Sequence, residues 1–448
     1  MIREDVVWAL QELGRRGPDY RLRRDYYEGR HRLAYATDKF RAAFGGLFHA
    51  FADNVSTVVV DAVRERLRIE GWGLTEGEGA GVEAAARTAE AEWAMAQLAM
   101  VAGEVHQEAL ALGDAYIIVW PGEDGTPIWH PNIAEETVAR YDPLLPGRIA
   151  FAAKAWLQDD KRARLTLYYP DRIERYATAT AQAGAAIPDT ADSWEPYTDD
   201  RDGPRVINPW GMVPVFHFPN RAGIGRRGRA EHDHAIPLQD ALNKSVLDTL
   251  VGGEFLALPQ RWATGLELPI DPVTGQEVAP IPGPGMLLHT PAAEARFGQF
   301  DSADLRPLLA VSNDWRAEIA RVTDTPPHRL MLLGDGPWPS GEALKTAEAP
   351  LVAKVENRQE VWGTVWGQAM GLALRMAQNP VDRPLRPVWK PARTESEVEK
   401  VTVAEAKVRA GVSRRQVLRE LGYTSEEVDL IMEETAAERR AAMDGGMA

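Results

Sequence analysis

Apolar positions in the first quarter of the chain recur every three to four residues, the spacing that places side chains on one face of an α-helix. This pattern predicts helices over residues 2–13, 51–67 and about 83–112. A glycine-rich break from Gly71 to Gly81 separates the second helix from the third. The chain is therefore expected to begin with an α-helical region.

After Gly113 the apolar pattern changes to the two-residue period of β-strands. Residues 116–120 form a short apolar run, and residues 148–157 alternate as a half-buried strand does. With a further strand predicted at 165–169, this region is expected to form an antiparallel meander. Residues 177–204 are rich in Ala, Thr, Asp and Gly and are expected to form a long loop.

Two long helices are predicted in the second half of the chain, over residues 234–257 and about 303–322. The intervening residues 259–300 are rich in Pro and Gly and predict loops and short strands. A pair of long helices joined in this way makes an elongated unit that buries little apolar surface within one chain. We therefore expect neighbouring subunits to pack side by side.

A third and very long helix is predicted from Ser340 to about Gln378. Ser340 is a good helix N-cap, and Glu342 stands in the first turn, where the helix dipole favours an acid. Pro350 lacks the amide that the helical hydrogen-bond ladder requires, so a kink is expected there. Residues 395–440 predict two or three small charged helices.

The composition narrows the possible classes of protein. The 448 residues include no Cys, which excludes disulfides, thiolate metal sites and a Cys nucleophile. No apolar run approaches the roughly 20 residues of a membrane span, and the start of the chain lacks the basic and apolar regions of a signal peptide. We therefore expect a soluble protein with no membrane partner.

The formal net charge of −15 bears on nucleic-acid binding. Tight binding depends on neutralising phosphates with Lys and Arg, and the chain as a whole lacks such a basic footprint. Two basic segments, residues 15–32 and 221–229, either contact DNA or an acidic partner or face solvent. Any contact with DNA is therefore expected to be weak, local and transient.

Catalytic motifs are missing from the sequence. The loop Gly334–Gly341 superficially resembles a phosphate-binding loop, but it lacks the Gly-Lys-[Ser/Thr] ending, and its prolines remove amide donors. There is no Gly-x-Ser-x-Gly elbow, and the nine His are scattered along the chain. We therefore expect no catalytic residue and no cofactor, and predict that the protein is not an enzyme.

One dense group of possible metal ligands suggests a different function. Glu231, His232, Asp233 and His234 are consecutive, and a site built on Glu231, His232 and His234 would suit a metal-dependent hydrolase. Adjacent residues of a helix point to different sides, however, which argues against a shared metal. The prediction is therefore no metal site.

A segment near the C-terminus suggests a second alternative. Residues 403–430 have a helix–Gly–helix spacing that mimics a helix-turn-helix. Arg414, Arg415 and Arg419 stand on the second helix, where a DNA-binding regulator exposes basic residues. The residues beyond them are strongly acidic, which disfavours DNA recognition.

Seven short segments, in a fixed order, carry a family resemblance. They are 26–33 (YYEGRHRL), 66–72 (RLRIEGW), 109–120 (ALALGDAYIIVW), 168–173 (YYPDRI), 236–244 (IPLQDALNK), 325–327 (TPP) and 340–345 (SGEALK). In this order they resemble the portal proteins of long-tailed phages, the SPP1-like family, especially those of actinobacterial phages. The resemblance spans residues 20–380, and the last part of the chain matches only loosely.

The resemblance implies an α+β fold with an elongated, portal-like subunit. Its expected parts are a mixed α/β wing (1–231), two stem helices (232–258 and 302–325) with a small α/β clip between them (259–301), a tunnel loop region (326–340), a long kinked channel helix that returns to the wing (340–392) and a helical crown (393–448).

The resemblance also implies a function. The chain is expected to form a homo-oligomeric ring, typically a dodecamer, at one capsid vertex of the virion, after assembly in the host cytoplasm. Double-stranded DNA passes through such a ring without sequence specificity during genome packaging and ejection. The implied protein partners are the terminase large subunit, the major capsid and scaffold proteins and the head-completion adaptor.

The implied DNA-channel residues lie in the tunnel loop and the helix that follows it. The loop residues are Leu333, Gly334, Asp335, Gly336, Pro337, Trp338 and Pro339. Because the loop has one acidic and no basic residue, it is expected to touch DNA sterically rather than to clamp phosphates. Lys345 and Lys354 on the helix are expected to offer shallow contacts to DNA.

Overall fold

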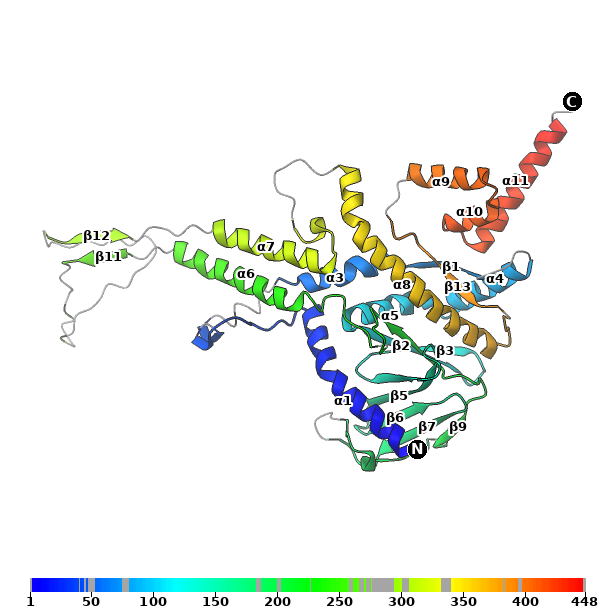
Figure 1. Cartoon of the computed structure of the whole chain (residues 1–448), viewed down its shortest axis with the longest axis horizontal. Coiled ribbons are helices and arrows are strands. Elements are labelled where there is room, and N and C mark those ends of the chain that lie inside the picture. The colour runs from blue at the N-terminus through cyan, green and yellow to red at the C-terminus, as the bar shows by residue number, and fades with distance from the viewer. Residues whose placement is uncertain are drawn as a thin grey trace.

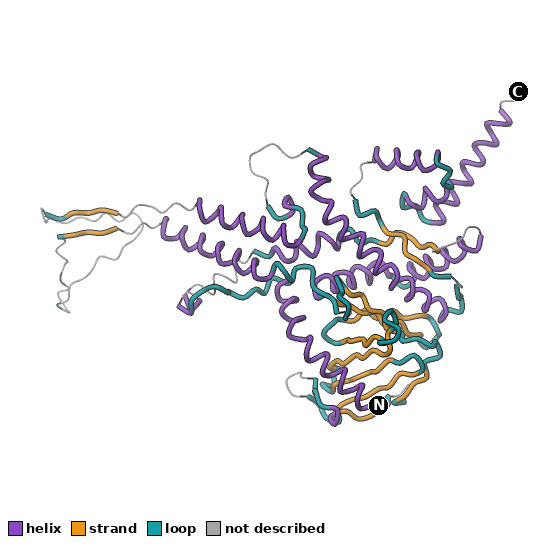
Figure 2. Tube along the Cα trace, viewed as in Figure 1, coloured by secondary structure: helices purple, strands orange, loops and turns teal. Residues whose placement is uncertain are grey.

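The structure is a computed structural model of the chain. It describes all residues except 1, 40, 44–45, 47–52, 75–79, 183–186, 200–202, 226, 258–260, 266–269, 271–274, 276–293, 300–305, 332–339, 382, 394–396 and 446–448. The described residues form a mixed α+β fold, which confirms the predicted class (Figure 1, Figure 2).

The helices and strands follow one another along the chain as Figure 1 labels them. The helices are α1 (Ile2–Tyr27), α3 (Val55–Arg64), α4 (Ala80–Met95), α5 (Leu98–Leu112), α6 (Ile236–Ala257), α7 (Arg306–Thr323), α8 (Gly341–Met376), α9 (Glu397–Arg409), α10 (Arg414–Glu420) and α11 (Ser425–Gly445). The strands are β1 (Ile69–Leu74), β2 (Asp114–Pro121), β3 (Pro127–Asn132), β4 (Thr137–Tyr141), β5 (Ile149–Leu157), β6 (Ala163–Tyr168), β7 (Arg172–Thr178), β8 (Trp194–Pro196), β9 (Arg205–Ile207), β10 (Val215–Pro219), β11 (Arg261–Thr264), β12 (Arg296–Gln299) and β13 (Leu385–Trp389).

The strands of the described chain pair antiparallel in four sheets. The largest has the order β4-β5-β6-β7-β8, with β9 also paired to β7, and a second sheet has the order β10-β2-β3. The pairs β1-β13 and β11-β12 form the other two. Pairing of β5 with β6, in which Ala155 lies opposite Leu165, confirms the predicted meander.

Several parts of the chain differ from the sequence prediction, among them the break expected from Gly71 to Gly81, which contains part of strand β1 and the start of α4. The helical block expected over 83–112 is two helices, because Gln97 adopts a left-handed backbone conformation with φ 52° and interrupts the helical ladder. The loop expected over 177–204 contains the short strand β8, whose Trp194 is buried against the six-stranded sheet.

Helix α1 continues far beyond the predicted segment and passes through Pro18. Proline normally weakens a helix interior, because it removes one ladder bond, but tertiary contacts hold the second half of α1. Tyr20 is fully buried, and its hydroxyl donates to Asp114 at 2.7 Å. Arg23 forms a two-point ion pair with Asp233, at 2.8 Å for each bond. Packing and charge therefore override the local preference.

The first half of α1 covers one face of the six-stranded sheet (Figure 1). Its apolar residues Val6 and Leu10 are buried with Phe151, Leu165 and Leu167 from that face. Alternation along β5 and β6 supplies these apolar positions, and the intervening side chains point to the opposite face. The sheet is thus covered by a helix on one face.

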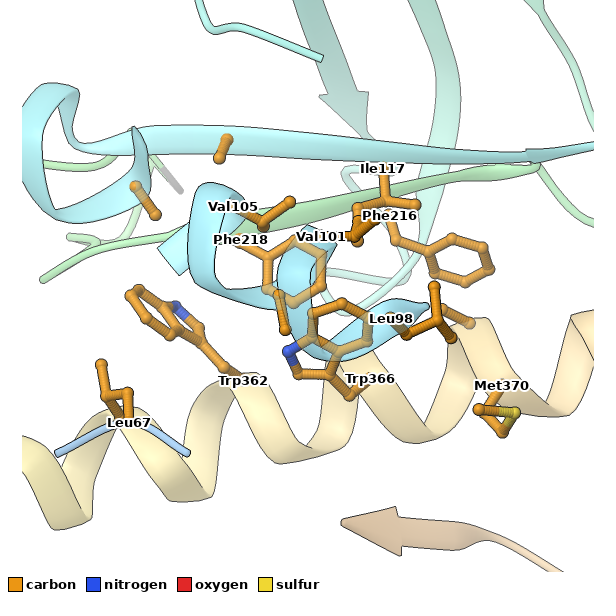
Figure 3. Close-up of a cluster of buried hydrophobic side chains, with 14 of the residues drawn as sticks. Leu67, Leu98, Val101, Val105, Ile117, Phe216, Phe218, Trp362, Trp366 and Met370 are labelled. Atoms are coloured by element: carbon orange, nitrogen blue, oxygen red, sulfur yellow. The ribbon is translucent and has the colours of Figure 1, made fainter. Parts of the chain in front are cut away.

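The largest core surrounds the second half of α8 (Figure 3). Trp362 and Trp366 are fully buried and point from α8 toward α5 and the β2-β10 pair. The indole nitrogen of Trp366 donates to Nε2 of His106 at 2.9 Å, and Nδ1 of His106 lies 3.3 Å from the carbonyl of Leu67. Burial lowers the pKa of His106 to about 3, so the ring is neutral and serves as a fixed hydrogen-bonding spacer.

Strand β13 lies directly against α8 at two glycines. A Cβ at Gly367 would meet the carbonyl oxygen of Leu385 at 2.0 Å, and one at Gly363 would meet Nε1 of Trp389 at 3.1 Å. The close approach of backbone to backbone therefore requires Gly367.

Helices α6 and α7 lie side by side and project from the body, with the β11-β12 hairpin beyond their far end (Figure 1). The indole nitrogen of Trp315 on α7 donates to the hydroxyl of Ser245 on α6 at 3.2 Å. The subunit is therefore elongated, and among the described residues the contacts of this helical hairpin with the body lie at its base.

The C-terminal helices α9, α10 and α11 pack mainly on one another and touch the body through α4. Arg415 of α10 bonds Glu83 of α4 at 2.9 Å and Asp429 of α11 at 2.8 Å. Among the described helices, none has the length and apolar character that a bilayer crossing requires.

Candidate functional site

The beginning of α8 is the most exposed part of the long helix. Ser340 is its N-cap, and the Ser340 hydroxyl oxygen accepts from the amide of Ala343 at 3.2 Å, which confirms the predicted helix start. Eight of the first ten residues of α8 are exposed. The first turns of α8 run at an angle to the rest of the helix (Figure 1). Pro350 lies at the end of the exposed stretch. After Pro350 the helix enters the core.

A buried ion pair fixes α8 where it enters the core. The Lys354 ammonium contacts the carboxylate of Glu231, whose side chain is fully buried, and it also donates to the carbonyl of Thr323 at the end of α7. Glu231 precedes α6. One lysine therefore joins the end of α7, the segment that leads into α6 and the helix α8.

Arg358, one turn later on α8, completes this junction. Its guanidinium bonds Glu231 at 2.9 Å, the side-chain oxygen of Asn220 at 3.0 Å and the carbonyl of Lys354 at 3.0 Å. Burial alone would raise the pKa of the Glu231 carboxyl, but the attraction of Lys354 and Arg358 outweighs it and lowers the pKa to about 2. The carboxylate is therefore ionised at neutral pH. We call Glu231, Lys354, Arg358 and Asn220 the α8 anchor.

The base of α6 is attached to the body by buried amide side chains. The carbonyl oxygen of Gln239 accepts from the backbone amides of Val55 at 2.9 Å and Ser56 at 3.2 Å, at the start of α3. The amide nitrogen of Asn243 lies 2.8 Å from Nδ1 of His31. These contacts explain why segment 236–244 is polar on a buried face, and they set the direction in which the α6-α7 hairpin projects.

Three of the four residues considered as metal ligands have structural partners, and the fourth, His234, is exposed. Glu231 belongs to the α8 anchor, and Asp233 pairs with Arg23. His232 is fully buried, with Nε2 at 3.1 Å from the carbonyl of Arg23, and burial lowers its pKa to about 4. Over the part of the chain that the structure describes, no group of three or more His, Asp or Glu side chains is arranged to hold a metal.

The basic residues of 15–32 are largely engaged within the subunit. Arg16 bonds Glu12 at 2.6 Å. Arg24 bonds Glu108 and Glu135, each at 2.7 Å. Arg24 thus ties α1 to α5 and to the turn before β4, while Arg15, Arg21, Arg30 and Arg32 are exposed.

The other two basic segments also have partners inside the subunit. Arg415 in the helix-turn-helix-like segment 403–430 points toward α4 and α11, so it is not displayed for a DNA groove. In segment 221–229, Arg227 pairs with Asp19, and a Cβ at Gly228 would meet the carbonyl oxygen of Gly113 at 1.7 Å. The backbone at Gly228 is therefore packed closely over the start of β2, whereas residues 221–225 are exposed.

The structure separates the two lysines predicted to contact DNA. Lys345 is exposed on the first turns of α8. The side chain of Lys354 is only 12% exposed, and its charge is met by Glu231. Lys354 therefore helps to position the helix, and its contact with DNA stays a prediction. The seven tunnel loop residues, 333–339, lie outside the described residues. The sequence alone gave no indication of the Glu231–Lys354 pair, because its members are far apart in the chain.

The polar clusters described above hold helices in place. Residues 80–444 match the family described as phage portal protein, SPP1 Gp6-like. The chain belongs to this family of phage portal proteins. The family is structural and non-enzymatic, in agreement with the prediction from the sequence.

Two curated relatives carry the same description. The portal protein of Mycobacterium phage D29 is 26% identical over 319 residues, covering 68% of this chain and 61% of the relative. The portal protein of Mycobacterium phage L5 is 28% identical over 158 residues, covering 34% of this chain and 32% of the relative. The chain thus spans less than two thirds of the length of these relatives.

Solved structures of a gene transfer agent also align with the chain. A chain of the virion of the native particle aligns with a TM-score of 0.41 and 12% identity, over 83% of this chain and 87% of that chain. A chain of the neck of the native particle, computed with C12 symmetry, aligns with a TM-score of 0.37 and 14% identity, over 83% and 88% of the two chains.

Proposed function

We propose that this chain is one subunit of a portal ring at a capsid vertex, through which the double-stranded genome passes during packaging and ejection. The observation that carries the proposal is the arrangement of α8, whose first turns are exposed while the α8 anchor holds the rest of the helix. A helix held in this way presents an uncovered surface at a defined position, as the lining of a channel requires.

The regions of the subunit take the roles expected of a portal. Helices α6 and α7 lie within the proposed stem (232–258 and 302–325), and β11 and β12 within the proposed clip (259–301). Residues 1–231 form the wing, 326–340 the tunnel loop region, 340–392 the channel helix and its return to the wing, and 393–448 the crown. Support comes from the projecting hairpin, whose length is hard to explain in an isolated subunit.

The proposed partners follow from these roles. Copies of the chain form the ring, in the proposal a dodecamer, and the clip receives first the terminase large subunit and later the head-completion adaptor. The major capsid and scaffold proteins surround the ring during assembly. The terminase hydrolyses ATP and drives the DNA, while the portal aligns, gates and retains it.

Electrostatics supports a passive role in DNA transport. The net charge of −15 repels a polyanion, so DNA slides past the wall without long residence. On the exposed turns of α8, Glu342 precedes Lys345, which leaves one basic position for a shallow phosphate contact. In this proposal, transport depends on the shape of the channel more than on electrostatic attraction between the channel wall and the DNA.

Electron microscopy of the purified chain tests the proposal. Rings with a central hole wide enough for duplex DNA, and a light-scattering mass that is a multiple of the 49.5 kDa subunit, are the expected result. Portals that need scaffold to assemble would stay small in isolation, so the chain is also coexpressed with scaffold and major capsid protein. Failure to form rings under both conditions would refute the proposal.

A further inference from the structure

The face of the six-stranded sheet opposite α1 carries basic and aromatic side chains. Across β5, β6 and β7, the paired positions place Lys154 beside Thr166 and Thr166 beside Arg175. The next row of the same face pairs Trp156 with Arg164. Strands lie roughly 5 Å apart, so three cations gather within about 10 Å of one another on a chain that is acidic overall.

Two adjoining cavities lie over this face, with volumes of about 310 Å³ and about 160 Å³. Both are lined by Trp156, Thr166 and Arg175, so they form one continuous depression. The larger cavity reaches Asn132 on β3, and the smaller reaches Tyr197. We call this depression the sheet groove. Its size suits a few side chains of a peptide and excludes a nucleic-acid duplex.

Buried polar groups in the sheet groove lack partners. Arg164 is 5% exposed, and while its Nη2 bonds Asp160 at 2.6 Å, its Nε and Nη1 have no acceptor in the described chain. Asn132 is 6% exposed, with Nδ2 donating to the carbonyl of His130 at 2.6 Å, and its Oδ1 has no donor. Burying such groups costs free energy unless a ligand or a water molecule forms hydrogen bonds with them. The groove therefore offers both donors and an acceptor.

Lys154 adds a charge that is only partly compensated. It forms no ion pair within the described residues, and its ammonium lies 5.0 Å from the centroid of the Trp156 ring. Burial lowers the pKa of Lys154, and the nearby Glu136 only partly offsets this effect. A carboxylate that entered the groove would stabilise this ammonium.

We propose that the sheet groove binds an acidic peptide segment of another protein. Its carboxylates accept from Lys154 and Arg164, and a backbone amide of the same segment donates to Oδ1 of Asn132. Asp160 and Asp199, which pair with Arg164 and Arg175, have side chains 45% and 31% exposed, so water competes for them and an incoming carboxylate can share these arginines.

The groove fits a peptide better than a nucleic acid or a free phosphate. Base stacking needs open aromatic faces, but Lys154 covers Trp156, and Arg164 lies 4.4 Å from the centroid of the Tyr197 ring. A phosphate carries no N–H group for Asn132. An acidic peptide supplies both the carboxylates and the amide donor that the groove lacks.

The test uses the full chain in the oligomeric state that it adopts, with a fluorescently labelled hexaglutamate peptide as the probe. Binding is followed by fluorescence polarisation at low salt, with hexaglutamine, a six-residue oligothymidylate and inorganic phosphate as the other arms. We expect saturable binding of hexaglutamate. Lys154→Gln should weaken it about tenfold, because one charge-assisted hydrogen bond is lost, whereas Lys154→Arg should retain it.

A matched control removes a lysine elsewhere. Lys390 is exposed at the end of β13, outside the groove, so Lys390→Gln should leave the affinity unchanged. Absence of hexaglutamate binding overturns the proposal. So does equal binding of the oligothymidylate or displacement by phosphate, which would indicate a phosphate site, and so does an equal loss in Lys390→Gln, which would indicate general charge attraction. If thermal unfolding shows that Lys154→Gln is not folded, Arg164→Gln replaces it with the same expectation.

Discussion

The α8 anchor makes a quantitative prediction for Glu231→Gln. Glutamine has the shape of a protonated glutamate, so this substitution imitates neutralisation of the carboxyl while Lys354 and Arg358 remain charged and buried. The pKa of Glu231 is lowered from 4.5 to about 2, which corresponds to about 3 kcal/mol in favour of the ionised form. Breaking a buried ion pair at one partner typically costs a similar 3–5 kcal/mol. We expect Glu231→Gln to reduce the free energy of unfolding by about 3 kcal/mol at pH 7.

Urea unfolding followed by far-ultraviolet circular dichroism measures this difference. The lowered pKa stabilises the fold above the unfolded value of 4.5, and this stabilisation is lost as the pH falls from 4.5 toward 2. The gap between wild type and Glu231→Gln should therefore narrow below pH 4.5. Glu318→Gln is the control, because Glu318 forms an exposed pair with Arg321 on α7. If both substitutions change the stability equally little, the anchor does not hold α8 as argued.

Three further predictions address packing, pH and DNA. Gly367→Ala should lower the unfolding free energy by more than about 2 kcal/mol, since its Cβ would meet the carbonyl oxygen of Leu385, and urea unfolding measures the loss. Burial lowers the pKa values of His106 and His232 to about 3 and about 4, below the unfolded value of 6.5. The unfolded chain therefore binds more protons, so stability should fall as the pH drops from 6.5, by up to about 1.4 kcal/mol per pH unit for each histidine. Lys345→Ala should weaken the binding of duplex DNA to assembled rings and flatten its salt dependence, measured by titration at several salt concentrations.

Each of these predictions has a matched control or a contrary result. A Cβ at Gly371 meets nothing within 4 Å, so Gly371→Ala should keep or raise stability, and an equal loss at both glycines would refute the packing argument. Stability that is constant between pH 6.5 and 5 would contradict neutral buried histidines. An unchanged salt dependence in Lys345→Ala would remove Lys345 from the channel contacts.

Local signals in the sequence predicted much of the fold. Ser340 marked the start of α8, and the alternation in 148–157 marked β5, because caps and strand periodicity act over a few residues. The break at Gln97 had no such signal, since no glycine or proline stands there and only the backbone conformation reveals it. The continuation of α1 through Pro18 likewise depended on distant contacts.

The candidate site was harder to predict, for the same physical reason. Glu231 stands among acidic and histidine neighbours in the sequence, which resembles a metal-binding cluster, but its partners Lys354 and Arg358 come from a helix more than 120 residues later. A buried carboxylate and its counter-ions leave no local pattern, because only the folded chain brings them together. The residue types therefore indicated that Glu231 binds a positive charge, but they did not show that this charge belongs to side chains of α8.

Arginines that pair with carboxylates inside the subunit help to explain where its net negative charge lies. Arg23, Arg24 and Arg358 all bond carboxylates that are at least partly buried, so these basic side chains hold helices together instead of facing solvent. Taken together these clusters are electrically neutral, so they leave the net charge of −15 to the rest of the chain. A protein with this net charge repels DNA at long range. The pairs that make the subunit rigid thus also leave the rest of the chain acidic, and this combination suits a conduit that DNA must pass without being held.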